Sequence, residues 1–155
     1  MKTNLPARIP LCASEVELHY KRPLFDSMVH VTCAEDAVRY LKQSINTKQL
    51  DLRESFWVIL MTNANRILGI SEVATGTTRG VQTNIKYILQ LVLLFNSSSL
   101  IAAHNHPSGN LNPSKKDVSE TKKLQRLLKL MEVTLLDHII ITSESFLSFA
   151  QEDLL

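Results

Sequence analysis

The run SFWVILMT over residues 55–62 restricts the fold of this chain more than any other segment. It has the length of a β-strand, and its apolar residues are continuous rather than alternating with polar ones. A strand that is apolar on both faces needs cover on both faces, which a central strand of a layered sheet receives. The sequence therefore predicts a sheet with other elements packed on each side.

Several other segments have the composition of strands that extend this sheet. The residues Asn63–Asn65 predict a turn, after which ANRILGISEVAT has the pattern of a second hairpin arm. The segment VTLLDHIIIT is strongly β-branched. The expected strands are residues 15–22 at an edge, 64–75, 100–104, 133–142 and, as a short strand or a turn of helix, 146–155.

Helical spacing of apolar residues occurs in 32–45, 84–99 and 115–131. Thr32 followed by Glu35 predicts a capping box, and Asn84 predicts a cap for the second helix. The alternation of strands and helices predicts an α/β (α+β) fold, a single layered domain in which helices pack on a mixed β-sheet. We assign residues 1–14 to a loose N-terminal arm and residues 15–155 to the domain.

The composition is that of a globular protein, with 155 residues, 45% of them hydrophobic and 21% charged. It excludes the low hydrophobicity of a disordered chain. The apolar run YILQLVLLF (87–95) is too short to span a bilayer, and the N-terminus has no apolar core of a signal peptide. We therefore expect a cytoplasmic protein with no membrane association.

The stretch AAHNHPSGNLNPSKKD (102–117) contains the candidate metal-binding residues of the chain. In a strand, His104 and His106 point to the same face, so their imidazoles can converge while Asn105 points away. A turn follows, and Asp117 then lies in the first turn of the next helix. Two imidazoles and one carboxylate suit a catalytic zinc site with an open fourth position.

A second interpretation of this stretch needs no metal. Ser114 and Asp117 have the spacing of an N-terminal helix cap, which explains both residues on its own. It does not explain two histidines that converge at a strand end. The two interpretations are compatible, because an aspartate at a helix start can cap the helix and also bind a metal.

The order His-x-His, then Ser114, two residues and Asp117 resembles the signature of the JAMM (MPN-type) metalloproteases. The fuller string HNHPSG…PS..D resembles the bacterial RadC family, a branch of that superfamily. The segments LLDHIII (135–141) and FWVILMTNANRILG (56–69) are similar to RadC as well. The resemblance covers most of residues 15–155 and implies a JAMM/MPN (cytidine-deaminase-like) catalytic domain.

The resemblance also implies roles for single residues. In JAMM enzymes two histidines and one aspartate hold the zinc, which here implies one Zn²⁺ per chain on His104, His106 and Asp117. The motif serine, Ser114, helps to hold the tetrahedral intermediate. A glutamate before the first core strand is the general base, and Glu54 matches that position, with Glu72 as a competitor. The implied reaction is hydrolysis of a peptide or isopeptide bond in a peptide or protein substrate.

The chain departs from the family pattern in two places. The usual Pro-Arg-Glu stretch before the zinc loop is replaced by TNIKY (83–87), which we expect to alter the floor or rim of the site. The N-terminal helix-hairpin-helix segment of longer RadC proteins is not found in this sequence. Asp137 and His138 resemble the family's Asp-His pair, and we expect them to form hydrogen bonds rather than to bind metal.

The sequence is compatible with two other functions. One is a DNA-repair-associated DNA-binding factor, which would need a basic surface although the net charge is only +2. A basic segment does exist, and it suits a solvated helix face as well; its members are Lys115, Lys116, Lys122, Lys123, Arg126 and Lys129. The other is a catalytically silent MPN-type interaction module. The edge character of residues 15–22 would also allow a homodimer.

Overall fold

The computed structural model describes residues 20–76 and 82–155. Its elements are 3₁₀ helix η1 (Phe25–Ser27), α1 (Ala34–Ser44), 3₁₀ helix η2 (Thr47–Gln49), β1 (Ser55–Met61), β2 (Ile67–Thr75), α2 (Ile85–Leu94), β3 (Ser99–Asn105), α3 (Lys115–Leu130), β4 (Thr134–Ile141) and β5 (Phe146–Ser148). The strands form one sheet in the order β2-β1-β3-β4-β5. Strands β3 and β4 are parallel and the other neighbours are antiparallel, which confirms the mixed sheet.

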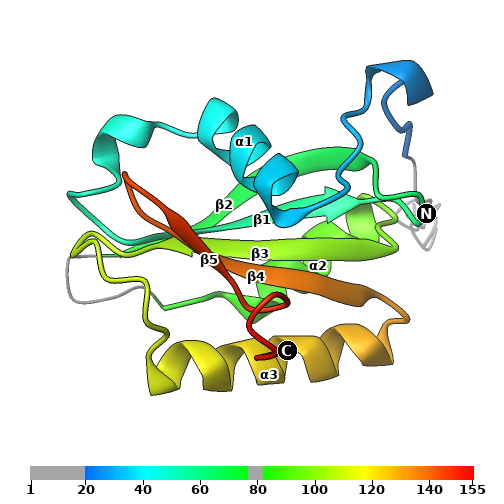
Figure 1. The fold of residues 1–155 in the computed structure, drawn as a ribbon. Helices are drawn as coiled ribbons and strands as arrows, with labels where there is room; N and C mark the ends of the chain where they lie inside the picture. The colour runs from blue at the N-terminus through cyan, green and yellow to red at the C-terminus, as the bar shows by residue number, and fades with distance from the viewer. Residues whose placement is uncertain (1–19, 77–81) are drawn as a thin grey trace, which may run out of the picture.

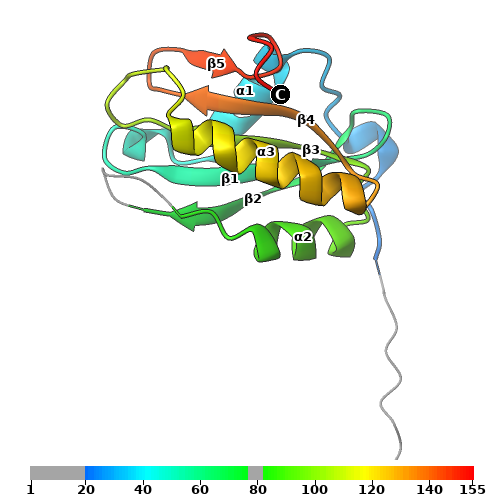
Figure 2. The same ribbon diagram turned by 90° about the horizontal axis from the view of Figure 1, so that it is seen from below.

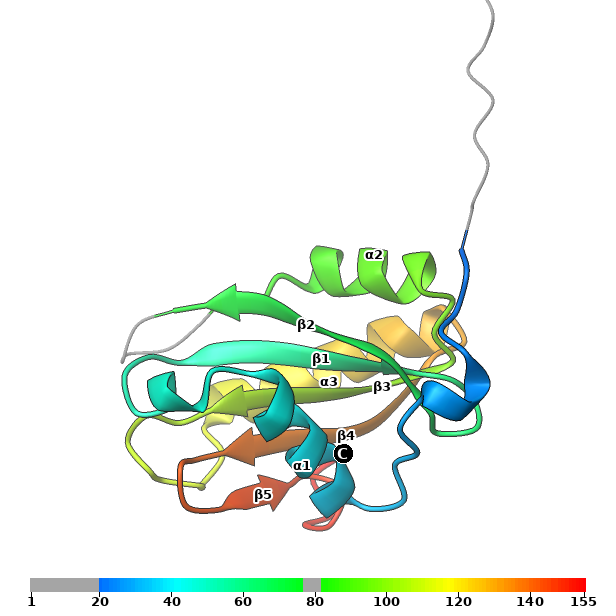
Figure 3. The ribbon, with the colours of Figure 1, turned by 90° about the horizontal axis from the view of Figure 1, so that it is seen from above.

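The sheet lies between two helical layers, as the run at 55–62 predicts. Helix α1 covers one face, and α2 and α3 cover the opposite face (Figure 1). Figure 2 looks onto the face that carries α2 and α3, and Figure 3 looks onto the face that carries α1. The described residues therefore form a single layered α/β domain of the expected class.

Two apolar cores result from the alternation of side chains along the central strands. Phe56, Val58 and Leu60 of β1 pack toward α2 and α3, together with Leu124 and Leu128. The intervening residues of β1 pack toward α1 in a second core, which also contains Ala37, Leu41, Trp57, Ile59, Met61 and Ile101. All seven residues of β1 are buried, so the strand has the two-sided cover that its composition requires.

Most elements agree in type and approximate position with the sequence patterns, although α2 ends at Leu94, five residues before the end of the helix predicted at 84–99. Two further predictions have a different outcome. The expected edge strand at 15–22 lies mostly outside the described residues, as does the arm at 1–14, and residues 20–22 are not in a strand. The capping box expected from Thr32 and Glu35 is wrong. Asp36 accepts hydrogen bonds from the Thr32 backbone N–H (3.0 Å) and hydroxyl (2.6 Å) instead. None of the helices among the described residues is both long and apolar enough to cross a bilayer.

The topology brings the N-terminal end of β1 beside the C-terminal end of β3. These two strands are antiparallel, and Phe56 is opposite His104. On its other side β3 pairs with β4, where His104 is opposite Ile140. Helix α3 follows β3 after a loop, so its first turn returns to the same end of the sheet (Figure 2). Residues from β1, β3 and α3 can therefore meet there.

Candidate metal centre

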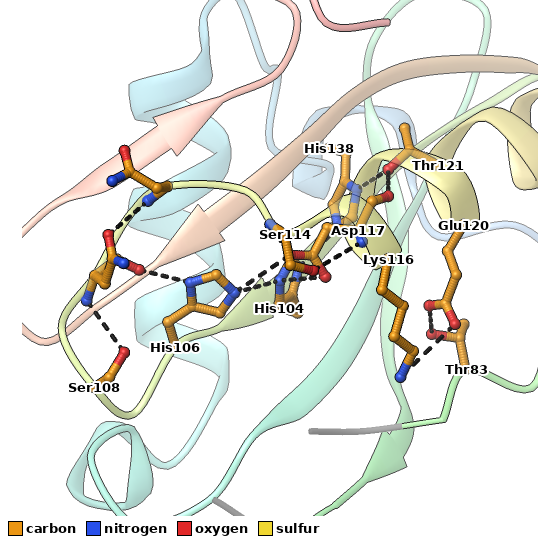
Figure 4. A network of polar contacts seen from close by, with 12 residues as sticks. Thr83, His104, His106, Ser108, Ser114, Lys116, Asp117, Glu120, Thr121 and His138 are labelled. Atoms are coloured by element: carbon orange, nitrogen blue, oxygen red, sulfur yellow. Dashed lines mark hydrogen bonds and ion pairs between the residues drawn. The ribbon is translucent and has the colours of Figure 1, made fainter. Parts of the chain in front are cut away.

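The side chains of His104, His106 and Asp117 converge at this end of the sheet (Figure 4). The Nε2 atoms of the two histidines are 3.0 Å apart. Asp117 Oδ1 is 3.5 Å from His104 Nε2, and Asp117 Oδ2 is 3.6 Å from His106 Nε2. Ligand atoms on a tetrahedral zinc ion, with bonds of about 2.0–2.1 Å, are about 3.3 Å from one another. The three separations in the cluster are close to that value.

The hydrogen bonds behind His106 fix which of its nitrogens carries the proton. His106 Nδ1 is 2.6 Å from the backbone oxygen of Asn110. A carbonyl oxygen can only accept, so Nδ1 carries the hydrogen and donates it. In the neutral ring Nε2 then has a free lone pair, and it is directed toward His104 and Asp117.

A longer series of hydrogen bonds determines which nitrogen of His104 carries the hydrogen. The Thr121 hydroxyl donates to the backbone oxygen of Asp117 (2.6 Å), so it can only accept from His138 Nδ1. His138 is neutral, so its Nε2 has no hydrogen and accepts from His104 Nδ1 at 2.8 Å. The lone pair of His104 Nε2 therefore also faces the cluster. This series of hydrogen bonds begins at His104 and ends at the backbone oxygen of Asp117.

Three proton acceptors thus converge on one point, namely two imidazole lone pairs and one carboxylate. Such an arrangement is unfavourable without a cation between the acceptors, because like dipoles and a negative charge face one another. A divalent metal ion between the acceptors would remove this repulsion, and imidazole and carboxylate are ligands that it prefers. A proton shared by His106 and Asp117 removes only part of the repulsion. The donor set and its spacing therefore fit a metal ion.

The two histidines have opposite pKa shifts. Burial lowers the pKa of His104 to about 4, against the charge of Asp117, which acts to raise it. The hydrogen bond with Asp117 raises the pKa of His106, against a smaller effect of desolvation. Desolvation lowers the pKa of the fully buried His138, which keeps this ring neutral as the hydrogen-bond chain requires.

Asp117 is fixed by the cap of α3. The Ser114 hydroxyl accepts from the Asp117 backbone N–H at 3.1 Å, and the Asp117 carboxylate accepts from the Ser114 backbone N–H at 2.7 Å. This is the capping box that the sequence predicts, and it coexists with the approach of Asp117 to the histidines. Desolvation acts to raise the pKa of Asp117. Hydrogen bonds from His106 and Ser114 outweigh it, so the carboxyl pKa is held well below its usual range.

Glu54 and Glu72 differ in their position relative to the cluster. Glu54 lines an open pocket together with His106 and Ser114. Its charge adds to the larger influence of Asp117 in raising the pKa of His106, so the carboxylate is within electrostatic reach. Glu72 is opposite Trp57, which packs on the α1 face of the sheet, and it accepts a hydrogen bond from Thr75. Of the two glutamates, Glu54 is therefore the better candidate for the general base, because it lines the pocket beside His106.

The segment that departs from the family pattern contacts the helix of the site. The Thr83 hydroxyl donates to Glu120 at 3.0 Å, and Glu120 is 3.9 Å from Lys116 (Figure 4). Thr83 and Glu120 also line a small apolar pocket with Phe56 and His138. The replaced stretch therefore lies next to the groups that support His104.

Sequence reasoning did not identify Thr121 or the Asn110 carbonyl as parts of the site. Thr121 is a polar residue on the inner face of an amphipathic helix, which is a weak signal. A backbone oxygen gives no sequence signal at all. Asp137 and His138 form hydrogen bonds, as expected. The Asp137 carboxylate accepts from the His138 and Ala150 backbone N–H groups and from the Ser148 hydroxyl, and neither Asp137 nor His138 is in the cluster.

The model of a known protein family matches the region of the chain that contains the site. The model of the family described as "RadC-like JAB domain" matches residues 31–154. A UPF0758 protein of Flavobacterium johnsoniae is 33% identical over 122 residues, which cover 79% of this chain and 52% of that protein. A UPF0758 protein of Coprothermobacter proteolyticus is 35% identical over 126 residues, which cover 81% of this chain and 54% of that protein.

A UPF0758 protein of Fusobacterium nucleatum is 30% identical over 152 residues, which cover 98% of this chain and 64% of that protein. The matched part of this chain thus spans between half and two thirds of the length of these curated relatives. Their names state no activity. The match with the family model includes every residue of the cluster and Glu54.

Proposed function

This chain belongs to the family of RadC-like JAB domains, and from that premise we propose that it is a zinc-dependent hydrolase of peptide or isopeptide bonds. The observation that carries the proposal is the convergence of two imidazole lone pairs and one carboxylate, with ligand atoms 3.0–3.6 Å apart. His104, His106 and Asp117 would hold one Zn²⁺, and the fourth position would stay open. When bound there, zinc supplies a water of lowered pKa and polarises a carbonyl group.

The residues around the pocket have complementary tasks in this reaction. Glu54 takes a proton from the attacking water and delivers it to the leaving amine. The Ser114 hydroxyl, whose oxygen accepts from Asp117 N–H, would donate its hydrogen to the oxyanion that forms on the substrate. The capping box holds this hydroxyl in place, because the hydroxyl accepts from Asp117 N–H in the first turn of α3 and the Asp117 carboxylate accepts from Ser114 N–H in return.

The metal content of the purified protein tests the first half of the proposal. We expect about one zinc per chain in protein prepared without added metal or chelator, and none in His106→Ala. The variant Lys122→Ala, a change on the exposed face of α3, serves as the matched control and should keep its zinc. If the wild-type protein takes up no zinc when the metal is offered, the proposal fails and the alternative of a catalytically silent interaction module is favoured.

Cleavage of a peptide library, followed by mass spectrometry, tests the second half. New amine and carboxyl termini should appear with zinc-loaded protein and disappear with a chelator. Glu54→Gln should keep its zinc and lose about 10²–10⁴-fold in rate, because it cannot accept a proton. Glu72→Gln is the matched control and should keep its activity. Loss of activity in Glu72→Gln alone would reverse the assignment of the base.

DNA binding is the second candidate, and it rests on the outer face of α3. This helix packs inward through Thr121, Leu124 and Leu128, and its exposed cations are Lys115, Lys116, Lys122, Lys123, Arg126 and Lys129. A DNA-binding surface predicts affinity for duplex DNA that falls steeply with salt. Lys122→Ala combined with Arg126→Ala should weaken that binding. Absence of binding at low salt would leave α3 with an ordinary solvated face.

A further inference from the structure

Asn105 lies between the two histidines in sequence but faces the opposite side of the sheet. Its side chain is fully buried, with 0% exposure. The amide oxygen accepts from the Ser55 backbone N–H at 2.7 Å. The amide nitrogen donates to the backbone oxygens of Leu50 (2.6 Å) and Arg53 (2.8 Å). Both ends of the amide are therefore fully used in bonds to one segment.

These three bonds enclose Glu54. Arg53 and Ser55 are its immediate neighbours, and Leu50 ends the 3₁₀ turn that leads into the segment. The Glu54 backbone oxygen is fixed as well, since it accepts from Gly76 N–H at 2.8 Å. The main chain on each side of Glu54 is thus held against the strand that carries His104 and His106. Residues 50–54 lie in turns and irregular backbone, where the N–H groups of Leu52 and Arg53 bond to the Gln49 carbonyl. The amide of Asn105 supplies the partners that the Leu50 and Arg53 carbonyls would find in a strand or helix.

We propose that Asn105 is a positioning residue that sets the location of the Glu54 carboxylate relative to His104, His106 and Asp117. The inference rests on the proposed function, in which Glu54 moves the proton. The amide is suited to this task because it offers one acceptor and two donors at a fixed spacing. Aspartate would have the same shape, but it would direct an oxygen at the Leu50 and Arg53 carbonyls. Serine would be too short to reach them.

The first measurement asks whether Asn105 holds the segment. Hydrogen exchange of the Ser55 amide should be at least tenfold faster in Asn105→Ser than in the wild type, and less accelerated in Asn105→Asp, which keeps an acceptor for this N–H but loses both donors. Ile59→Val provides the control, because it removes one methyl group from a buried position on the same face and leaves the segment untouched. Metal binding by both Asn105 variants should persist, since their three ligands are unchanged.

The second measurement asks whether the segment controls the carboxylate. Co²⁺ accepts the same nitrogen and oxygen ligands and has a visible spectrum that reports its surroundings. We expect Glu54→Gln to shift the pH midpoint of the cobalt spectrum. Asn105→Ser, which leaves the charge unchanged, should shift it in the same direction by at least half as much. Combined with Glu54→Gln, Asn105→Ser should add little, since both changes remove one influence. Ile59→Val should leave the midpoint unchanged.

The outcomes separate this inference from the proposed function. If Glu54→Gln shifts the cobalt spectrum and Asn105→Ser does not, Asn105 is only a structural residue and the inference is overturned. If the wild type binds no Co²⁺, or Glu54→Gln leaves the spectrum unchanged, the proposed function fails and the inference fails with it. Shifts in both kinds of variant, without additivity, support the inference.

Discussion

His104 and His106 direct Nε2 at the same point, but the groups behind the two rings lie in different surroundings. Behind His104 are the side chains of His138 and Thr121, and all three residues are at most 2% exposed. Behind His106 is the backbone oxygen of Asn110, in a loop whose residues 108–110 are exposed. One ring is supported by the core between the sheet and α3, and the other by a loop.

The difference shows two ways to prepare the same ligand atom. The orientation of His104 depends on the identity of side chains from β4 and α3, so substitutions in the core can disturb it. The orientation of His106 depends on the backbone path of the loop, so it is insensitive to most side chains there. The opposite pKa shifts of the two rings follow from the same contrast, since burial dominates for His104 and the Asp117 hydrogen bond for His106.

Removal of each ring should give the largest contrast. In metal-free protein we expect His104→Ala to lower the free energy of unfolding by about 2–4 kcal/mol, because it leaves a cavity and an unpaired His138 in the core. His106→Ala should cost less than about 1 kcal/mol. Urea unfolding in a chelator measures both. Equal losses of unfolding free energy would contradict the conclusion that the core supports His104 and the loop supports His106. Both variants should lose zinc binding.

Acid should destabilise the metal-free protein through His104. The unfolded chain takes up this proton near pH 6.5 and the folded chain only near pH 4, so stability is present above pH 6.5 and is lost as the pH falls to 4. The shift corresponds to a loss on the order of 3 kcal/mol. His138 acts in the same direction. The raised pKa of His106 acts oppositely, adding stability below its unfolded pKa that is lost as the pH rises through the folded value.

Urea unfolding of the metal-free protein between pH 7 and pH 4 measures this dependence. His104→Gln cannot titrate and should have a flatter profile than the wild type over that range. Imidazole NMR signals give a direct control, because His106 should take up its proton above pH 6.5 and His104 only near pH 4. Protonation of the two rings at the same pH would show that their surroundings do not differ as the structure indicates.

Much of this arrangement follows from local sequence patterns. The apolar run of β1 requires cover on both faces, and strand periodicity brings His104 and His106 to one side with Asn105 on the other. The Ser114–Asp117 spacing predicts the cap that fixes the carboxylate. The order of elements predicts the layered mixed sheet. Each of these inferences uses residues that are close together in the chain.

The remaining features depend on contacts between distant segments or on the backbone. His138 and Thr121 meet only because α3 packs across β4, and no local pattern specifies that register. The Asn110 oxygen acts through loop geometry rather than side-chain chemistry. Near α1, either Glu35 or Asp36 could accept the hydrogen bonds of Thr32, because both acids lie in the first turn of the helix. The sequence pattern predicts Glu35, but the structure has Asp36. The role of Asn105 likewise appears only once β1 and β3 are paired.

Substitution of Thr121 tests the core side of the comparison more finely. Thr121→Val keeps the shape but removes the acceptor for His138, and we expect a loss of about 1–3 kcal/mol in unfolding free energy. Zinc affinity should fall by about 10-fold or more, because His104 loses its fixed tautomer. Thr121→Ser keeps the hydroxyl and should retain most of the affinity. Equal zinc affinities for the valine and serine variants would show that the hydrogen-bond chain does not orient His104.

Substitution of Gly109 tests the loop side and should have the smallest effect on zinc affinity. Gly109 has a φ of +77°, and a Cβ added there would meet no atom within 4 Å. Gly109→Ala should therefore cost about 1–2 kcal/mol through the backbone alone. Gly109→Asn should cost less, because asparagine tolerates this conformation. Gly109 N–H also donates to the His106 carbonyl at 3.1 Å, so zinc affinity should fall in the alanine variant more than in the asparagine variant. If neither variant changes zinc affinity while Thr121→Val does, the loop does not orient His106, and the support of the site lies in the core alone.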